Sequence, residues 1–183
     1  PAPNKSAFNM NLATDKSTFE AMNVAYQHAS DSVGSNMGVY GLTSMVFALL
    51  LTFYSAKRTV NRKWIHLGTL ILGGIGFISM SFIPDASYLW ICFGLIGFSW
   101  GSILSMPYAM LSSSVDETKM GLMMGLFNMF IVIPQIVAAL GGVNVLSKVF
   151  GDSPIAPMLL AGVSLVIAGL CNLLITDKTV ARG

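Results

Sequence analysis

Residues 120–140 read MGLMMGLFNMFIVIPQIVAAL and contain no Asp, Glu, Lys or Arg. A helix of about 20 mostly apolar residues is long enough to cross the roughly 30 Å of hydrocarbon in a bilayer. Four other stretches lack charged residues: those between Asp31 and Lys57, Lys63 and Asp85, Asp85 and Asp116, and Asp152 and Asp177. The pattern predicts an all-α polytopic membrane protein with about five transmembrane helices, near residues 37–56, 65–83, 88–112, 120–140 and 157–175.

The composition supports the same class. Hydrophobic residues make up 54% of the chain and charged residues only 10%, whereas a soluble domain carries roughly 25% charged residues. A soluble bundle could not cover its surface with so few charges. The net charge of +2 is too small to indicate nucleic-acid binding. Cys92 and Cys171 both lie inside expected helices, so no disulfide is expected.

The basic residues predict an orientation, because cytoplasmic loops carry an excess of Lys and Arg. Residues 57–63 hold four of the ten basic residues. If this loop is cytoplasmic, seven basic residues lie inside and three outside, and the C-terminus is cytoplasmic. Residues 1–33 are then an extracytoplasmic polar segment, with a short amphipathic helix near residues 17–29, and residues 34–183 form the transmembrane bundle.

Two amides stand out on the fourth expected helix. Asn128 and Gln135 share one face, with steps of three and four residues. The members of that face are Gly121, Gly125, Asn128, Val132, Gln135, Ala139 and Gly142. Amides both donate and accept hydrogen bonds, which suits a neutral, hydroxyl-rich solute. The alternative is that both amides are structural and bond to neighbouring helices.

The third expected helix carries a similar stripe that includes Ser105 and Tyr108, with Trp100 at its border. Aromatic rings beside hydroxyl donors suit the apolar face of a sugar ring, although Trp100 could equally pack against protein or lipid. Pro107 and Pro134 interrupt these two helices. Each proline removes a backbone hydrogen bond, and broken membrane helices often mark transporter sites.

The remaining small residues are expected to form close-packing surfaces. They are Gly34, Gly38 and Gly41, Gly73 to Gly76, and Pro157, Ala161, Ser164, Ala168 and Asn172. His66, at the start of the second expected helix, is interpreted as a hydrogen-bonding anchor at the membrane interface rather than a ligand. No carboxylate lies within a span, so an ion-coupling carboxylate would have to lie elsewhere. No motif indicates a catalytic residue, a cofactor or a metal site, and an enzyme is not expected.

Two strings resemble sugar transporters of the major facilitator superfamily: Phe98–Leu111 (FSWGSILSMPYAML) and Gly125–Gln135 (GLFNMFIVIPQ). They are most similar to sucrose- and maltose-type sugar:proton symporters, related to the glycoside–pentoside–hexuronide transporters. Ala25–Ala29 and Gly38–Tyr40 fit the same group. The family's cytoplasmic signature is degenerate here, because residues 57–63 keep the bases without the glycine or the acid. The resemblance covers the C-terminal half of such a transporter, and the start at Pro1 favours a fragment.

The resemblance implies part of a secondary active transporter that moves a neutral sugar, a disaccharide or glucoside, by proton-coupled alternating access. The expected partners are the sugar, the lipid bilayer of the cell membrane and the missing N-terminal half. Substrate-binding residues would be Asn128, Gln135, Tyr108, Trp100 and Ser105. Two alternatives remain: a membrane scaffold or assembly subunit without transport, and a lipid or drug carrier of the same superfamily.

Overall fold

The computed structural model describes residues 2–9, 12–55, 60–142, 145, 148–149, 151 and 155–175. Within these residues the chain is helical and contains no strand, which confirms the all-α class. The long helices are α1 (Ala13–Ser55), α2 (Arg62–Ser79), α3 (Leu89–Ser114), α4 (Met120–Val137) and α6 (Ile155–Cys171). Of the segments described, Ala13–Ser55, Ala86–Ser114, Glu117–Gly141 and Ile155–Leu174 are long and apolar enough to span a membrane.

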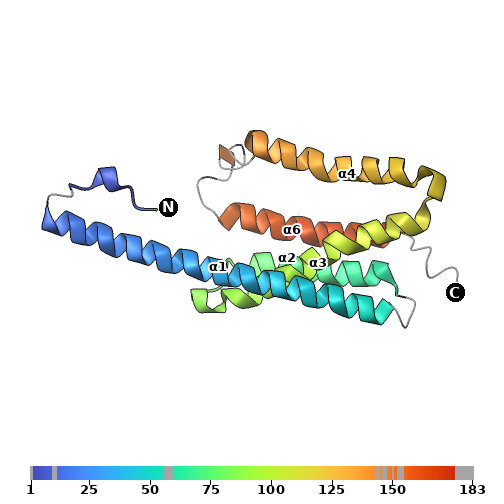
Figure 1. Ribbon diagram of the computed structural model, residues 1–183, viewed down its shortest axis with the longest axis horizontal. Coiled ribbons are helices and arrows are strands. Elements are labelled where there is room, and N and C mark those ends of the chain that lie inside the picture. The colour runs from blue at the N-terminus through green and yellow to red at the C-terminus, as the bar shows by residue number, and fades with distance from the viewer. Residues whose placement is uncertain are drawn as a thin grey trace.

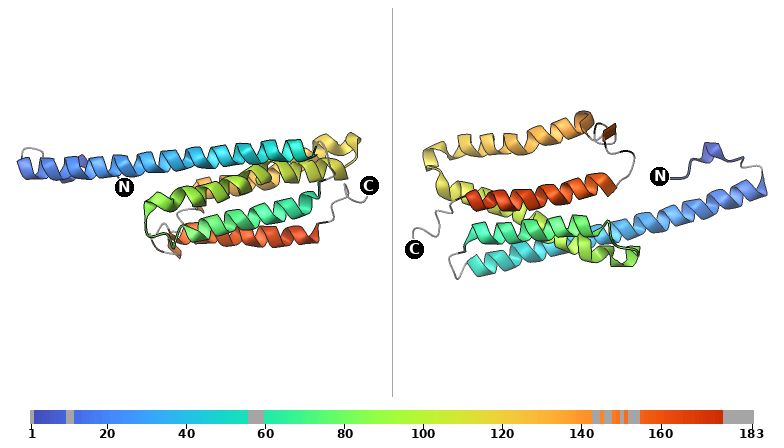
Figure 2. Two further views of the ribbon diagram at one scale, coloured as in Figure 1. Left: turned by 90° about the horizontal axis from the view of Figure 1, so that it is seen from below. Right: turned by 180° about the vertical axis from the view of Figure 1, so that it is seen from behind.

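Four of the helices form a packed group, and α4 stands apart from it (Figure 1). The helix α2 packs against both α3 and α6, while α1 packs along α3. A short turn that includes Glu117–Lys119 joins α3 to α4. From there α4 runs alongside the group without packing on it along its length, as the two further views show (Figure 2). One side of α3 and α6 is therefore left uncovered.

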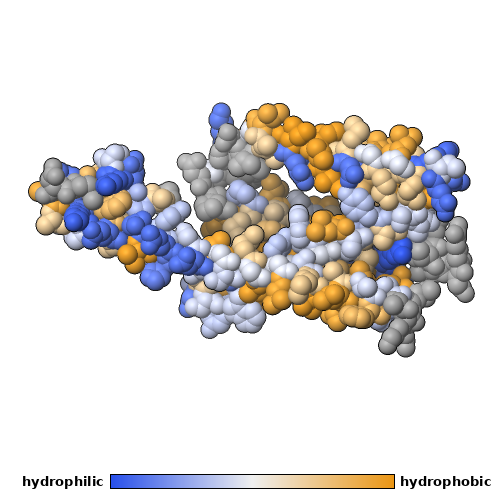
Figure 3. Space-filling view, in the orientation of Figure 1, coloured by the Kyte–Doolittle hydropathy of each residue, from blue (hydrophilic) through white to orange (hydrophobic). Residues whose placement is uncertain are grey.

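The first helix is longer than expected. At 43 residues and 1.5 Å per residue it is about 65 Å long, roughly twice the hydrocarbon thickness. The short helix expected near residues 17–29 and the span expected at residues 37–56 are one continuous element, because neither Gly nor Pro interrupts residues 13–33. Its N-terminal half projects beyond the other helices and carries most of the hydrophilic surface at that end (Figure 3).

Glycines set the close approach of α2 and α3. A Cβ on Gly73 would overlap the Cβ and Oγ of Ser99, and one on Gly76 would lie 3.0 Å from the carbonyl oxygen of Cys92. The expected packing role is confirmed for Gly73. Among the described residues it is wrong for Gly34, Gly38 and Gly41, because none of their atoms lies within 4 Å of a Cβ built there. The helix α1 meets α3 through a different face, which contains Tyr40, Thr43 and Phe47.

The expected packing face of the last helix is also corrected. The helix α6 approaches α2 through Gly162 and Gly169, where a Cβ would meet residues of α2. Ala161, Ser164 and Ala168 instead line open grooves. The face with the smallest residues packs, and the neighbouring face with Ala and Ser is left uncovered.

The outer surface is apolar where a lipid environment would meet it. No residue of the hydrophobic window in α4 is buried, and Leu122, Phe130 and Leu140 are each more than 70% exposed. Figure 3 shows this hydrophobic surface over α4. A soluble monomer rarely exposes so large an apolar surface to water. The chain is an integral membrane protein.

One end of the packed group is held by side chains at the start of α2. The Arg62 Nη1 donates to the carbonyl oxygen of Ala109 at 2.7 Å, and the Lys63 Nζ to that of Leu173 at 2.6 Å. In return, the Asn172 Nδ2 donates to the carbonyl oxygen of Lys63 at 2.6 Å. Cations favour the negative ends of helices, so these contacts tie the start of α2 to the ends of α3 and α6.

Candidate functional site

Two grooves run along the uncovered side of α3 and α6. The first, called here the histidine groove, has a volume of about 610 Å³ and is lined by His66, Asn172 and Phe127 among others. The second, the tryptophan groove, has a volume of about 670 Å³ and includes Tyr40 and Trp100. The lining residues that both grooves share are Ile103, Leu165 and Ala168. The two grooves therefore adjoin each other at these residues.

The structure brings two of the sequence-predicted residues together. The hydroxyl of Tyr108 on α3 donates a hydrogen bond to the Asn128 Oδ1 on α4. The ring of Phe127 stands edge-on to that of Tyr108, with centroids 5.0 Å apart and an interplanar angle of 77°. This polar and aromatic pair is the contact between the two proline-containing helices. It suits recognition of a neutral solute, and it equally suits a structural link between helices.

Trp100 and Ser105 lie on α3 but do not join that pair. Trp100 is 43% exposed and lines the tryptophan groove. Its ring is tilted by 46° against that of Tyr40, at a centroid distance of 6.2 Å. The Ser105 hydroxyl donates to the carbonyl oxygen of Gly101 in its own helix at 2.7 Å. Trp100 is therefore placed to contact a molecule in the groove, whereas the hydroxyl proton of Ser105 is already engaged in a hydrogen bond within α3.

Gln135 is separate from the other candidates. It lies near the end of α4 beside Pro134, and its side chain is exposed. Asn128 is also exposed, so the face that the two amides share is open along its length. The glycines at the start of this face, Gly121 and Gly125, have nothing within 4 Å of a built Cβ. The described residues thus offer no neighbouring helix to Gln135.

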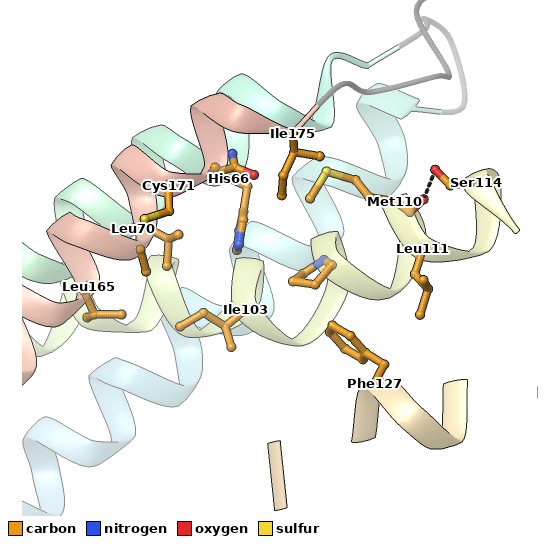
Figure 4. A pocket seen from close by; sticks show the side chains of 13 residues that line it. His66, Leu70, Ile103, Met110, Leu111, Ser114, Phe127, Leu165, Cys171 and Ile175 are labelled. Carbon is orange, nitrogen blue, oxygen red and sulfur yellow. Dashed lines mark hydrogen bonds between the residues drawn. The ribbon is translucent and has the colours of Figure 1, made fainter. Parts of the chain in front are cut away.

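Sequence reasoning missed the polar pair in the histidine groove. His66 is only 7% exposed, and its Nδ1 lies 2.8 Å from the Oγ of Ser102, which is fully buried. This contact confirms the hydrogen-bonding role expected for His66, whereas its partner and its burial were not predicted. The spacing from His66 to the charged Arg62 and Lys63 suggested a helix end, whereas the packing of α3 over α2 buries the ring. Figure 4 shows the His66 side chain extending into the groove toward α3.

Two buried polar atoms beside the grooves have no hydrogen-bond partner among the described residues. They are the Oγ of Ser99, in a side chain that is 1% exposed, and the Oδ1 of Asn172, in one that is 3% exposed. Ser99 lines the tryptophan groove and Asn172 the histidine groove. Because an unpaired buried polar atom costs free energy, both groups add hydrogen-bonding capacity to otherwise apolar walls.

Two acids mark the entries to α3 and α4, outside the spans. The Ser87 N–H donates to Asp85 at 2.9 Å, and the Thr118 N–H and hydroxyl donate to Asp116 at 3.0 and 2.9 Å. These hydrogen bonds hold the pKa of both carboxyls below the ordinary value, because they stabilise the charged form. Both acids therefore stay ionised at neutral pH, at the solvent-exposed turns.

A comparison with known proteins agrees with this arrangement. The sequence profile of the Major Facilitator Superfamily matches residues 10–182. No curated protein and no solved structure matches the chain. The match covers nearly the whole sequence and every long helix, and four of the five long helices, all except α2, are long and apolar enough to span a membrane. The chain belongs to the major facilitator superfamily of membrane transporters.

Proposed function

We propose that this chain is the C-terminal part of a secondary active transporter that moves a neutral sugar, a disaccharide or glucoside, by proton-coupled alternating access. The two halves of such a transporter rock around a central site. In this proposal the chain supplies one wall of the site. Asn128, Gln135 and Tyr108 bind sugar hydroxyls, Trp100 stacks on the sugar ring, and Ser105 borders the site.

The observation that carries the proposal is the hydrogen bond between Tyr108 and Asn128. The hydrogen bond brings a hydroxyl, an amide and an aromatic ring side by side on two helices, α3 and α4, that contain no charged residue. A neutral solute with many hydroxyls meets donors and acceptors there without the cost of leaving a charge unpaired. An ionic solute would find no partner of opposite charge on these helices.

The test is uptake of labelled sucrose and maltose by the complete protein in proteoliposomes. Asn128→Leu and Tyr108→Phe should each weaken sugar affinity, and the double variant should lose less than the sum because the two groups act as a pair. Met129→Leu, at the neighbouring exposed position on α4, is the matched control and should keep normal affinity. If Asn128→Leu, Tyr108→Phe and the double variant all keep normal sugar affinity, and the two single variants give a lower yield of protein, the pair is structural and a scaffold is favoured.

A second candidate function is transport of an amphiphilic lipid or drug. It is favoured by the lining of the two grooves, which is apolar apart from a few side chains such as His66 and Trp100. Apolar clefts with a few placed polar groups are typical binding sites for such ligands. Uptake of a fluorescent phospholipid by the same proteoliposomes, together with no uptake of either sugar, would select this candidate.

A further inference from the structure

We propose that His66 is a proton-binding site of this protein, which exchanges a proton with the histidine groove. An ionisable side chain inside a membrane helix is costly and usually serves transport or proton transfer. Histidine is the side chain whose ordinary titration falls nearest to physiological pH. Among the residues that line the histidine groove, His66 is also the only imidazole. From the sequence alone, His66 was interpreted only as a hydrogen-bonding anchor.

The geometry leaves one ring nitrogen for the proton. The Nδ1 of His66 is engaged with the Ser102 Oγ at 2.8 Å, while its Nε2 has no hydrogen-bond partner among the described residues. The side chain belongs to the wall of the groove, and the groove is open. In the neutral tautomer with a proton on Nδ1, the Nε2 lone pair is free to accept a proton from a hydronium ion in the groove. The Nε2–H bond forms as an O–H bond of the hydronium ion breaks, which leaves a water molecule.

Ser102 suits both protonation states. A serine hydroxyl can donate or accept by rotation of its O–H bond. In the neutral tautomer with a proton on Nδ1 it accepts from Nδ1–H, and it accepts from the same N–H after Nε2 has been protonated. Because Ser102 is fully buried, it holds the imidazole in place while Nε2 gains or loses the proton.

The charged and titratable groups around His66 are few. On α2, Arg62 and Lys63 lie one turn earlier, and their cationic heads donate to the carbonyl oxygens of Ala109 and Leu173. At the end of α6, Cys171 and the amide of Asn172 line the groove. The described residues of α3 and α4 that line it include no acid and no base. The two cations oppose protonation of His66, and the carbonyl end of α6 favours it.

The histidine groove adjoins the proposed solute site. The histidine groove and the tryptophan groove share the lining residues Ile103, Leu165 and Ala168. A solute against Trp100 would therefore lie in the groove next to the one that His66 lines. This part of the inference rests on the proposed transport of sugar, whereas the proton-binding site itself does not.

The direct test is nitrogen-15 NMR of the complete protein in lipid nanodiscs, with labelled histidine, as a function of pH. The His66 signals should change from the neutral to the protonated pattern within the range over which the protein stays folded. His28, exposed on the N-terminal half of α1, is the internal control, and His28→Gln assigns its signal. His66 is then the imidazole whose signal Ser102→Ala displaces. A His66 signal that keeps one protonation state throughout the range overturns the proposal.

A transport measurement tests the coupling. His66→Gln keeps a hydrogen-bonding group near Ser102 but cannot take up a proton. We expect it to lose sucrose or maltose uptake driven by a pH gradient and to retain exchange of labelled sugar at equal concentrations, whereas His28→Gln keeps both. Gradient-driven uptake at the wild-type level in His66→Gln overturns the coupling role. If the wild type moves neither sugar, the proposed function fails, and the NMR titration alone decides whether His66 binds a proton.

Discussion

Asn128 and Gln135 lie two turns apart on one face of α4, yet the structure gives them different surroundings. Asn128 accepts a hydrogen bond from Tyr108, so its replacement disturbs a second residue as well. Gln135 is exposed and makes no such contact with α3. Gln135 is therefore the cleaner position at which to separate binding from packing.

We expect Gln135→Leu to weaken sugar binding in the complete transporter while membrane expression stays largely intact. A buried hydrogen bond lost without replacement costs about 1–3 kcal/mol, which is roughly a five- to hundred-fold loss of affinity. Leu is similar in bulk to Gln, so lost packing should be secondary. Ligand-protection assays or uptake kinetics measure the effect. Val132→Leu, one turn earlier on the same face, is the control. Lower expression with normal affinity would show that Gln135 is structural.

The surroundings of single residues could be predicted from the sequence only in part. Contact between the amide of Asn128 on α4 and Tyr108 on α3 could be anticipated, because each residue lies on the polar stripe of its helix and the two helices are consecutive in the chain. The burial of His66 could not, since it depends on Ser102, 36 residues later, and on how closely α3 approaches α2. A sequence gives the face on which a residue lies but not the helix that covers that face.

Among the helices, close approach is decided by a few glycines rather than by all of them. Even within α2, the glycines differ in how closely a neighbouring helix approaches them. Gly73 faces Ser99 directly, whereas Gly68 has nothing within 4 Å of a built Cβ. Lipid gives helices no hydrophobic reason to associate, so van der Waals contact at such positions carries much of the association. The two glycines provide a matched pair on one helix.

Gly73→Ala should destabilise the packed group, because the new Cβ would overlap Ser99. Overpacking of this kind costs about 1–3 kcal/mol, which should lower the thermal denaturation midpoint in detergent. Gly68→Ala should be neutral or slightly stabilising, since Ala favours a helix by up to about 1 kcal/mol over Gly. Ser99→Gly should restore stability in the Gly73→Ala background. Equal stability of the two alanine variants would contradict the packing of α2 on α3.

The helices themselves could be read from the sequence, within limits that have a physical cause. Charge-free stretches located the spans, because each must fit an apolar layer. The continuity of the helix expected near residues 17–29 with the span expected at residues 37–56 was missed, because the residues of the first half are polar and carry no hydrophobic signal. The isolation of α4 was also missed, since its glycine face suggested a packed neighbour.

For the whole molecule, the structure fixes which turns lie on opposite sides of a membrane without fixing which side is cytoplasmic. The helix α3 contains 26 residues, about 39 Å at 1.5 Å per residue, which exceeds the hydrocarbon thickness. The turn before it, with Ser87, and the turn after it, with Glu117, must therefore emerge on opposite sides. Both residues are exposed. The distribution of basic residues predicts that Glu117 is cytoplasmic and Ser87 external.

Cysteine labelling decides the orientation. In the complete protein with Cys92 and Cys171 replaced by Ala, an impermeant maleimide should label Ser87→Cys in intact cells and Glu117→Cys only after permeabilisation. These positions are better probes than Asn61 in the basic loop, because the Asn61 Oδ1 is buried and poor access there would mimic a cytoplasmic location. Their separation by α3 also supplies a check, since a correctly inserted helix must give opposite results at its two ends. Labelling of Glu117→Cys, and not Ser87→Cys, from outside would reverse the orientation and move the charged start of α2, with Arg62 and Lys63, to the external side.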